Sequence, residues 1–295
     1  MDTTKLPTII IADPPFHDPS NCADLVIRTA DNVDFFVLKV LLSLDSPSSF
    51  FRHVLQASHH TEERDNLPVL EVKEDSSIFR ILLFFCYPYK IPEIRDFKQF
   101  TDVGTALEKY CIDNAFERFI EAVLASSVIK EQPARVFSVA VGNGWKKLAE
   151  TAMRNTLAIP LEPEVEFEEF RNMNALQHFR LRDYHRKCGK AVQDLNIKEK
   201  EQFSTNASMG HAQFVSMVSQ VDVIFNPDSI KEPLLPDIAL DEDIIQRTIA
   251  ASISECSSDE WAEIAASKVR LLGKLLAKEI DERISAVPLN MEWTK

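Results

Sequence analysis

The first part of the chain alternates apolar and polar residues with a period of two. Residues 23–28 read ADLVIR, and the polar pair Asp31 and Asn32 separates them from the apolar run at 35–38. Alternation interrupted by a short polar turn predicts a hairpin of two strands. Residues 67–72, LPVLEV, alternate again and predict a third strand.

Helical spacing surrounds these strands. Apolar residues recur every three or four positions from Lys39, Pro47 and its neighbouring serines interrupt the pattern, and a second short helix is expected from Phe50. Asp75 stands where a helix N-cap belongs before the apolar residues 78–85. The remaining amphipathic stretches are residues 97–110 and 113–125. The predicted order is β-β-α-α-β-α-α-α, which describes a compact α+β unit.

The following residues show only the helical period. Pro133 suits the first turn of a helix, the sequence GNG at 142–144 breaks that helix, and Trp145 begins the next. Two helices separated by such a short break are expected to form a helical hairpin. We expect Trp145 to be buried in its core. A longer helix is expected over residues 174–195.

The last hundred residues have less pattern. Residues 196–240 mix charges and prolines without periodicity, which is typical of a loop-rich insertion. A capping box at 257–260 precedes Trp261, also expected in the core, and a strongly amphipathic terminal helix. The chain is therefore expected to have four consecutive parts, at residues 15–125, 126–195, 196–240 and 241–295.

Five segments of the first unit share their order and spacing with the BTB (POZ) domain. One of them runs from Glu74 to LLFFCYP at 82–88, where the family has a buried helix that ends in an aromatic turn. The others are 15–16, 23–28, 36–44 and 106–110. Residues 15–125 therefore resemble a BTB/POZ domain. Two segments beyond it, 133–140 and 184–188, resemble the C-terminal helical extension of BTB proteins common in filamentous and mushroom-forming fungi.

The resemblance implies a fold class and a kind of function. The fold would be α+β, a small sheet with a helical cluster, followed by an all-α C-terminal region. The function would be non-enzymatic protein–protein interaction with homo- or hetero-dimerisation. Part of the family presents substrates to a cullin-based ubiquitin ligase. This adaptor role is the first alternative function. A transcriptional regulator is the second alternative, and it would need a DNA-binding partner because no zinc finger or basic stripe is recognised in the chain.

The resemblance and one unattached apolar segment together suggest interface residues. Ile9, Ile10 and Ile11 form a β-branched segment outside the compact unit, which needs a sheet edge in its own chain or in a partner. In the resembled family such a strand can exchange between the protomers of a dimer. The candidate dimer interface consists of Ile9, Ile10, Ile11, Val40, Leu41 and Leu44.

Three positions depart from the family pattern. The usual His-Lys after the second strand is Leu38-Lys39 here, and residues 46–50 are longer than the common Ser-Pro-x-Phe form. Many cullin-binding members carry a hydrophobic-x-Glu motif after the following helix. The candidate partner loop offers only His60, Thr61 and Glu62, in which a histidine replaces the apolar anchor.

Charge and composition limit the partners and the compartment. The chain has 46 acidic and 33 basic residues, a formal net charge of -13, which disfavours nucleic acid and anionic lipid unless a local basic patch exists. The longest apolar run, residues 81–87, is too short to span a bilayer, and the N-terminus has no secretory h-region. Five scattered cysteines suit a reducing compartment as buried thiols. These features predict a cytoplasmic or nuclear protein without membrane partners.

No catalytic or metal-binding pattern is complete. His185 and Cys188 have metal-ligand spacing but lack two further recognisable ligands, and the pair His59–His60 is expected to face solvent. The acidic residues 162–169 are expected to form a solvated linker, since no nucleophile accompanies Glu166, Glu168 and Glu169. We therefore expect no catalytic residue, no cofactor and no metal. The rival to an interaction protein is an enzyme whose active site lies in residues 196–295.

Overall fold

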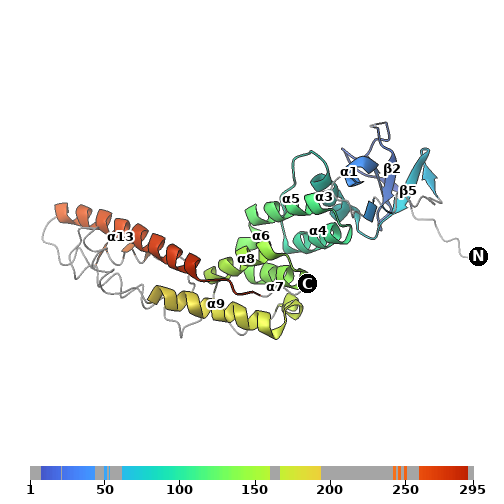
Figure 1. Ribbon diagram of the computed structural model, residues 1–295. Helices are drawn as coiled ribbons and strands as arrows, with labels where there is room; N and C mark the ends of the chain where they lie inside the picture. The colour runs from blue at the N-terminus through green and yellow to red at the C-terminus, as the bar shows by residue number, and fades with distance from the viewer. Residues whose placement is uncertain are drawn as a thin grey trace, which may run out of the picture. The chain divides into compact units, whose positions relative to one another are not determined.

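The computed structural model describes most of the chain as two compact units. The described residues are 8–20, 22–43, 50, 51, 53, 62–159, 167–193, 242, 243, 245, 246, 249, 250 and 259–291. Unit 1 comprises Met1–Gln132 and unit 2 comprises Pro133–Lys295. Figure 1 shows that unit 1 contains all the described strands together with helices, whereas unit 2 is helical. The α+β fold with an all-α C-terminal region is confirmed.

A five-stranded mixed sheet forms the first half of unit 1. The predicted hairpin is present, because β2 and β3 pair antiparallel with Val26 opposite Phe36. The predicted third strand is β5, which pairs parallel with β2. The sheet order is β1-β3-β2-β5-β4. The strands are β1 (Ile10–Ile11), β2 (Leu25–Arg28), β3 (Val33–Val37), β4 (Glu63–Arg64) and β5 (Leu67–Glu71).

A buried ion-pair cluster connects the strands of this sheet. The Asp34 carboxylate in β3 is fully buried and accepts hydrogen bonds from Arg28 Nε at 2.8 Å and from the Arg64 guanidinium. Arg28 also donates to Glu62 Oε1 at 2.6 Å. Because a buried charge is tolerated only when it is paired, this cluster fixes β2, β3 and β4 relative to one another.

The helices of unit 1 carry its aromatic core. Asp96 caps α4 by accepting from Gln99 N at 2.8 Å, whereas Asp75 occupies the predicted N-cap position of α3 without a side-chain bond. The helices are α1 (Lys39–Ser43), α3 (Ser76–Cys86), α4 (Phe97–Lys109), α5 (Asp113–Ala125) and α6 (Val128–Glu131). Their fully buried aromatic side chains include Phe79, Phe85, Phe100 and Phe119, and the C-cap residue of α4, Tyr110, is buried with them. Of the short helix expected from Phe50, only residues 50, 51 and 53 are described, and all three are helical.

Unit 2 begins with the predicted helical hairpin. Helices α7 (Pro133–Asn143) and α8 (Lys146–Asn155) pack together, and Gly144 with φ of 76° makes the turn between them. Trp145 is buried, as predicted. The long helices α9 (Ala175–Gln193) and α13 (Asp259–Ala286) pack against each other. The expected insertion at 196–240 and residues 257–258 of the capping box lie outside the described residues, as does the Trp261 side chain.

The acidic stretch is not simply a solvated linker. Residues 160–166 are not described, but η2 (Glu168–Asn172) packs on α7, where Gly142 lies so close that a Cβ on it would approach Asn172 Cβ to 3.0 Å. Glu169 accepts from Arg135 Nε at 3.0 Å, and this hydrogen bond lowers the pKa of the Glu169 carboxyl. The linker prediction is therefore wrong for Glu169.

The buried-thiol prediction holds for only some of the cysteines. Cys86 and Cys188 are buried, whereas Cys22 and Cys111 are exposed. The two exposed cysteines have φ of 61° and 53°, in the left-handed region. Cys111 directly follows the C-cap of α4, a position at which chains commonly turn left-handed and expose the side chain. The fifth cysteine, Cys256, lies outside the described residues.

Candidate protein-interaction site

The predicted N-terminal strand forms one edge of the sheet. It pairs parallel with β3 of the same chain through Ile10 N to Asn32 O and Ala12 N to Asp34 O, both at 2.9 Å. Backbone groups alternate in direction along a strand, so those of Ile9 and Ile11 face the outer side, where no other described strand pairs. In this single chain the strand pairs with β3 and leaves its outer edge open, and exchange with a partner stays a prediction.

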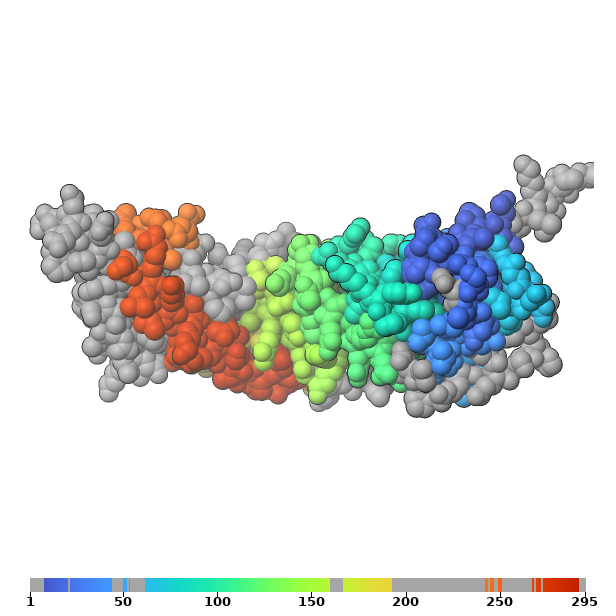
Figure 2. Space-filling model, turned by 90° about the horizontal axis from the view of Figure 1, so that it is seen from above, coloured from blue at the N-terminus to red at the C-terminus, as the bar shows by residue number. Residues whose placement is uncertain are grey.

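The side chains of this edge are apolar and exposed. Ile9, Ile10 and Ile11 are 39%, 57% and 47% exposed. Figure 2 shows the N-terminal residues, in blue, at the surface of unit 1. Consecutive exposed isoleucines on an open strand edge form a surface that favours strand addition or apolar contact with another chain.

Anchoring contacts hold this edge strand on unit 1. Phe16 is buried, and its ring lies edge-on to Tyr87 and Phe84 at centroid distances of 5.1 and 5.6 Å. Phe36 N donates to Phe16 O at 3.0 Å, and Arg80 Nη1 donates to Asp13 O at 2.9 Å. The exposed isoleucines are therefore presented by a fixed segment.

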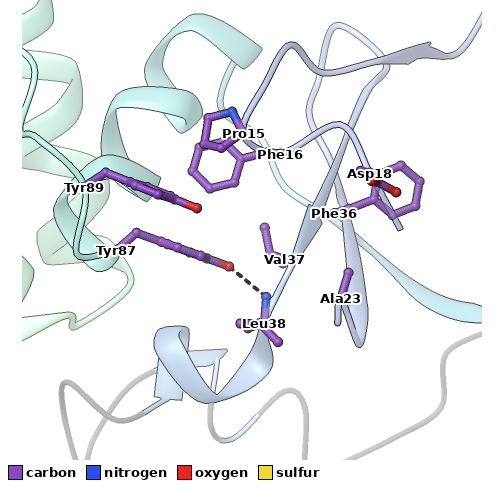
Figure 3. A pocket seen from close by; sticks show the side chains of 9 residues that line it. All are labelled: Pro15, Phe16, Asp18, Ala23, Phe36, Val37, Leu38, Tyr87 and Tyr89. Atoms are coloured by element: carbon purple, nitrogen blue, oxygen red, sulfur yellow. Dashed lines mark hydrogen bonds between the residues drawn. The ribbon is translucent and has the colours of Figure 1, made fainter. Parts of the chain in front are cut away.

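A pocket of about 270 Å³ lies beside this anchor (Figure 3). The Tyr87 and Tyr89 rings stack 5.7 Å apart, with both hydroxyls directed toward the pocket. Asp18 lies on the opposite wall, where hydrogen bonds from Ser20 lower the pKa of its carboxyl. The other lining residues are Pro15, Phe16, Ala23, Phe36, Val37 and Leu38. The sequence analysis did not select this pocket, although the Tyr87-Pro88-Tyr89 sequence was a signal for it.

Helix α1 is held at its start by residues distant in sequence. Leu38 N donates to the Tyr87 hydroxyl at 2.8 Å and Lys39 N donates to Asp24 Oδ1 at 2.7 Å. Burial raises the pKa of Tyr87 to about 12. Of the predicted interface residues on this helix, Val40 is 49% exposed and Leu41 is half-buried. Leu44 lies outside the described residues.

The candidate partner loop is described only at Glu62. His60 and Thr61, like His59, lie outside the described residues. The Glu62 carboxylate accepts from Arg28, and its carbonyl accepts from Val69 N at 3.1 Å. Glu62 is thus tied to the sheet, and its charge is already paired within the chain.

A second pocket of unit 1 is lined mainly by charged residues. It measures about 300 Å³ and lies between the loop before α3 and one side of α4. Glu74 accepts from Lys109 Nζ at 2.6 Å and from the Tyr110 hydroxyl. Partial burial acts to raise the pKa of Glu74, but these two hydrogen bonds outweigh it and the pKa is lowered. The charges in this pocket stabilise the contact between the α3 and α4 segments.

His185 and Cys188 lie in the core of unit 2. His185 Nε2 is 2.8 Å from Thr156 Oγ1, and burial lowers the pKa of His185 to about 4. Burial raises the pKa of the Cys188 thiol to about 11, which keeps the thiol protonated and unreactive. Within the described ranges, no three His, Cys, Asp or Glu side chains are grouped to hold a metal ion.

The comparison with known families agrees with this geometry. Residues 15–126 match the BTB/POZ domain family. The chain contains a BTB/POZ domain. The described part of this BTB domain has the mixed sheet and helical cluster that the resemblance implied, and BTB domains mediate protein–protein interaction. A search of curated proteins finds no match for the chain. None of the described helices is long and apolar enough to span a membrane.

Proposed function

We propose that this protein is a non-enzymatic interaction protein that self-associates through its BTB domain. The observation that carries the proposal is the run of three exposed isoleucines on a strand with an open outer edge. We name the exposed Ile9, Ile10 and Ile11 of β1 the N-terminal apolar surface, and Val40, exposed on α1, is a further candidate interface residue. In this proposal the N-terminal apolar surface becomes buried against a second copy, by contact at the β1 edge or by exchange of the strand.

The size of the apolar effect is compatible with a reversible dimer. Burying a fully exposed isoleucine gains about 1.5–3 kcal/mol, so each half-exposed one gains about 1 kcal/mol. Three isoleucines on each of two chains then contribute roughly 6 kcal/mol, to which edge hydrogen bonds and Val40 add. Association costs offset part of this gain, so we expect dissociation in the micromolar range.

Light scattering across micromolar concentrations tests the proposal. The average mass should rise from the monomer toward the dimer value as the concentration increases, whereas Ile11→Glu should stay at the monomer mass because a carboxylate would have to be buried at the interface. Leu271→Glu is the matched control, since Leu271 in α13 is 45% exposed, close to the 47% of Ile11. This control should show the same rise in mass with concentration as the parent protein.

A truncation separates strand pairing from side-chain contact. Removing residues 1–11 deletes β1 but keeps Ala12 to Phe16, including the Asp13 carbonyl to which Arg80 donates. The truncated chain should stay folded by circular dichroism and lose self-association. A monomeric parent protein, or dimerisation of Ile11→Glu and of the truncated chain as strong as that of the parent, would contradict the proposed interface.

A cullin-ligase adaptor is the second candidate function. The observation that favours it is the hairpin of α7 and α8, which follows the BTB domain in the chain where such adaptors carry an additional helical contact. The histidine at position 60 and the paired Glu62 oppose strong cullin binding. We expect a role in cytoplasm or nucleus for either function.

A further inference from the structure

Helix α9 presents a basic face on a strongly acidic protein. Its nineteen residues contain five Lys or Arg and one Asp, which leaves a formal charge of +4, whereas the whole chain carries -13. The apolar side of the helix is buried in unit 2 through Leu181, Tyr184, Cys188 and Val192. The exposed basic residues are Arg182, Arg186, Lys187 and Lys190. The sequence analysis looked for a DNA-reading stripe and did not identify this face.

Two large apolar side chains lie on the same exposed face. Phe179 is 61% exposed, the largest fraction among the bulky apolar residues that the structure describes, and Leu176 is 48% exposed. Arg182 and Arg186 follow Phe179 by three and seven residues, which places both guanidinium groups on its side of the helix. An exposed aromatic ring is therefore flanked by cations.

Internal ion pairs neutralise only part of this face. Asp183 accepts from Arg186 at 2.5 Å and contacts Lys187 at 2.7 Å, and these two cations lower the pKa of its carboxyl. Arg182 and Lys190 have no acidic partner among the residues that the structure describes. The face therefore keeps a net positive charge around Phe179.

We propose that this face of α9 binds an acidic peptide segment of a partner protein, with an apolar side chain of the peptide against Phe179. A bilayer is a poorer fit because the main apolar stripe of α9 is already buried in unit 2. A long nucleic acid is a poorer fit because it would also meet the remaining, acidic surface. Residues 176–190 extend over about 21 Å, which matches roughly six residues of extended peptide.

Peptide titration followed by fluorescence polarisation tests the proposal. The probe is a fluorescein-labelled ten-residue peptide of glutamates with two central phenylalanines, and we expect micromolar affinity. Phe179→Ser and Arg182→Glu should each weaken binding about tenfold, whereas Arg182→Lys should retain it. A peptide with glutamine in place of glutamate should not bind, because the electrostatic attraction is removed.

Matched variants on α13 and alternative ligands complete the test. Leu271→Ser and Lys278→Glu change one exposed apolar residue and one exposed basic residue of α13. Both variants should bind the peptide with unchanged affinity. Circular dichroism verifies that every variant is folded. Absence of peptide binding, or binding by the Phe179→Ser and Arg182→Glu variants with the same affinity as the parent protein, would overturn the proposal. Tighter binding to phosphatidylserine vesicles or duplex DNA than to the peptide would also overturn it. The same titration with Ile11→Glu is expected to be unchanged, which separates this site from self-association.

Discussion

At the scale of single residues, burial decides the protonation of His185. Its pKa falls to about 4 in the folded protein because its ring is buried. The unfolded chain has an ordinary histidine pKa near 6.5. Between pH 6.5 and pH 4 the unfolded state binds more protons than the folded state. The contribution of neutral, buried His185 to the unfolding free energy is therefore complete above pH 6.5 and is lost as the pH falls toward 4.

We predict that lowering the pH from 8 to 5 removes about 2 kcal/mol of unfolding free energy through His185. Denaturant titrations of the parent protein and of His185→Gln at both pH values measure this difference. Glutamine cannot take up the proton, so the variant should lose about 2 kcal/mol less than the parent on acidification. Equal pH dependence of the two proteins would contradict the assignment to His185.

Asp34 is a buried charge held by two arginines. It is fully buried and accepts from Arg28, itself only 6% exposed, and from Arg64. Asp34→Ala leaves the Arg28 charge buried with Glu62 as its remaining partner, so we predict a loss of about 3–5 kcal/mol in unfolding free energy.

The control for Asp34 is an exposed ion pair of the same unit. Lys98 and Asp102 are 2.6 Å apart, with side chains 79% and 41% exposed. Asp102→Ala should cost less than about 1 kcal/mol because solvent screens the pair. Comparable losses of unfolding free energy for the two variants would show that the Asp34 cluster does not hold the strands together.

At the scale of elements, the hydrophobic periodicity predicted those helices and strands that have a regular apolar face. The β2–β3 hairpin, α3 and the α7–α8 hairpin each follow from their own residues, and the structure contains all three. β4 was not predicted because it has two residues and depends on the left-handed turn at Asp65 and Asn66. In such short elements the tertiary partner determines the structure more than local propensity does.

The candidate interface residues show where sequence reasoning ends. Three isoleucines outside a compact unit were recognisable from their type and position, but their exposure after pairing with β3 depends on the fold. The pocket between Phe16 and Tyr89 combines segments that are distant in sequence. The basic face of α9 was missed because charges were counted over the chain and not around the helix.

At the scale of the whole molecule, two compact units divide the possible contacts. Unit 1 contains the BTB domain with the N-terminal apolar surface, and unit 2 contains the basic face of α9. Self-association and peptide binding would thus use different surfaces and different forces, one apolar and one electrostatic. A protein with both could hold two copies of a bound segment in one complex, which increases the effective affinity for a bivalent partner.

We predict weak or absent cullin binding by the whole protein. A hydrophobic anchor that fills a partner pocket can contribute about 2 kcal/mol, and a histidine fills such a pocket poorly. That loss corresponds to a roughly thirtyfold weaker affinity. In addition, the Glu62 carboxylate would have to leave Arg28, which is buried and would lose a charged partner.

Calorimetric titration against a cullin N-terminal region measures this affinity. If binding is weak, His60→Met should strengthen it, provided that residues 60–62 form the contact loop. His17→Met is the matched control, since His17 is exposed in unit 1 far along the chain from this loop, and it should have no effect. Nanomolar affinity of the parent protein would defeat the prediction and make the ligase adaptor the first function. No gain from His60→Met would show that the contact loop lies elsewhere.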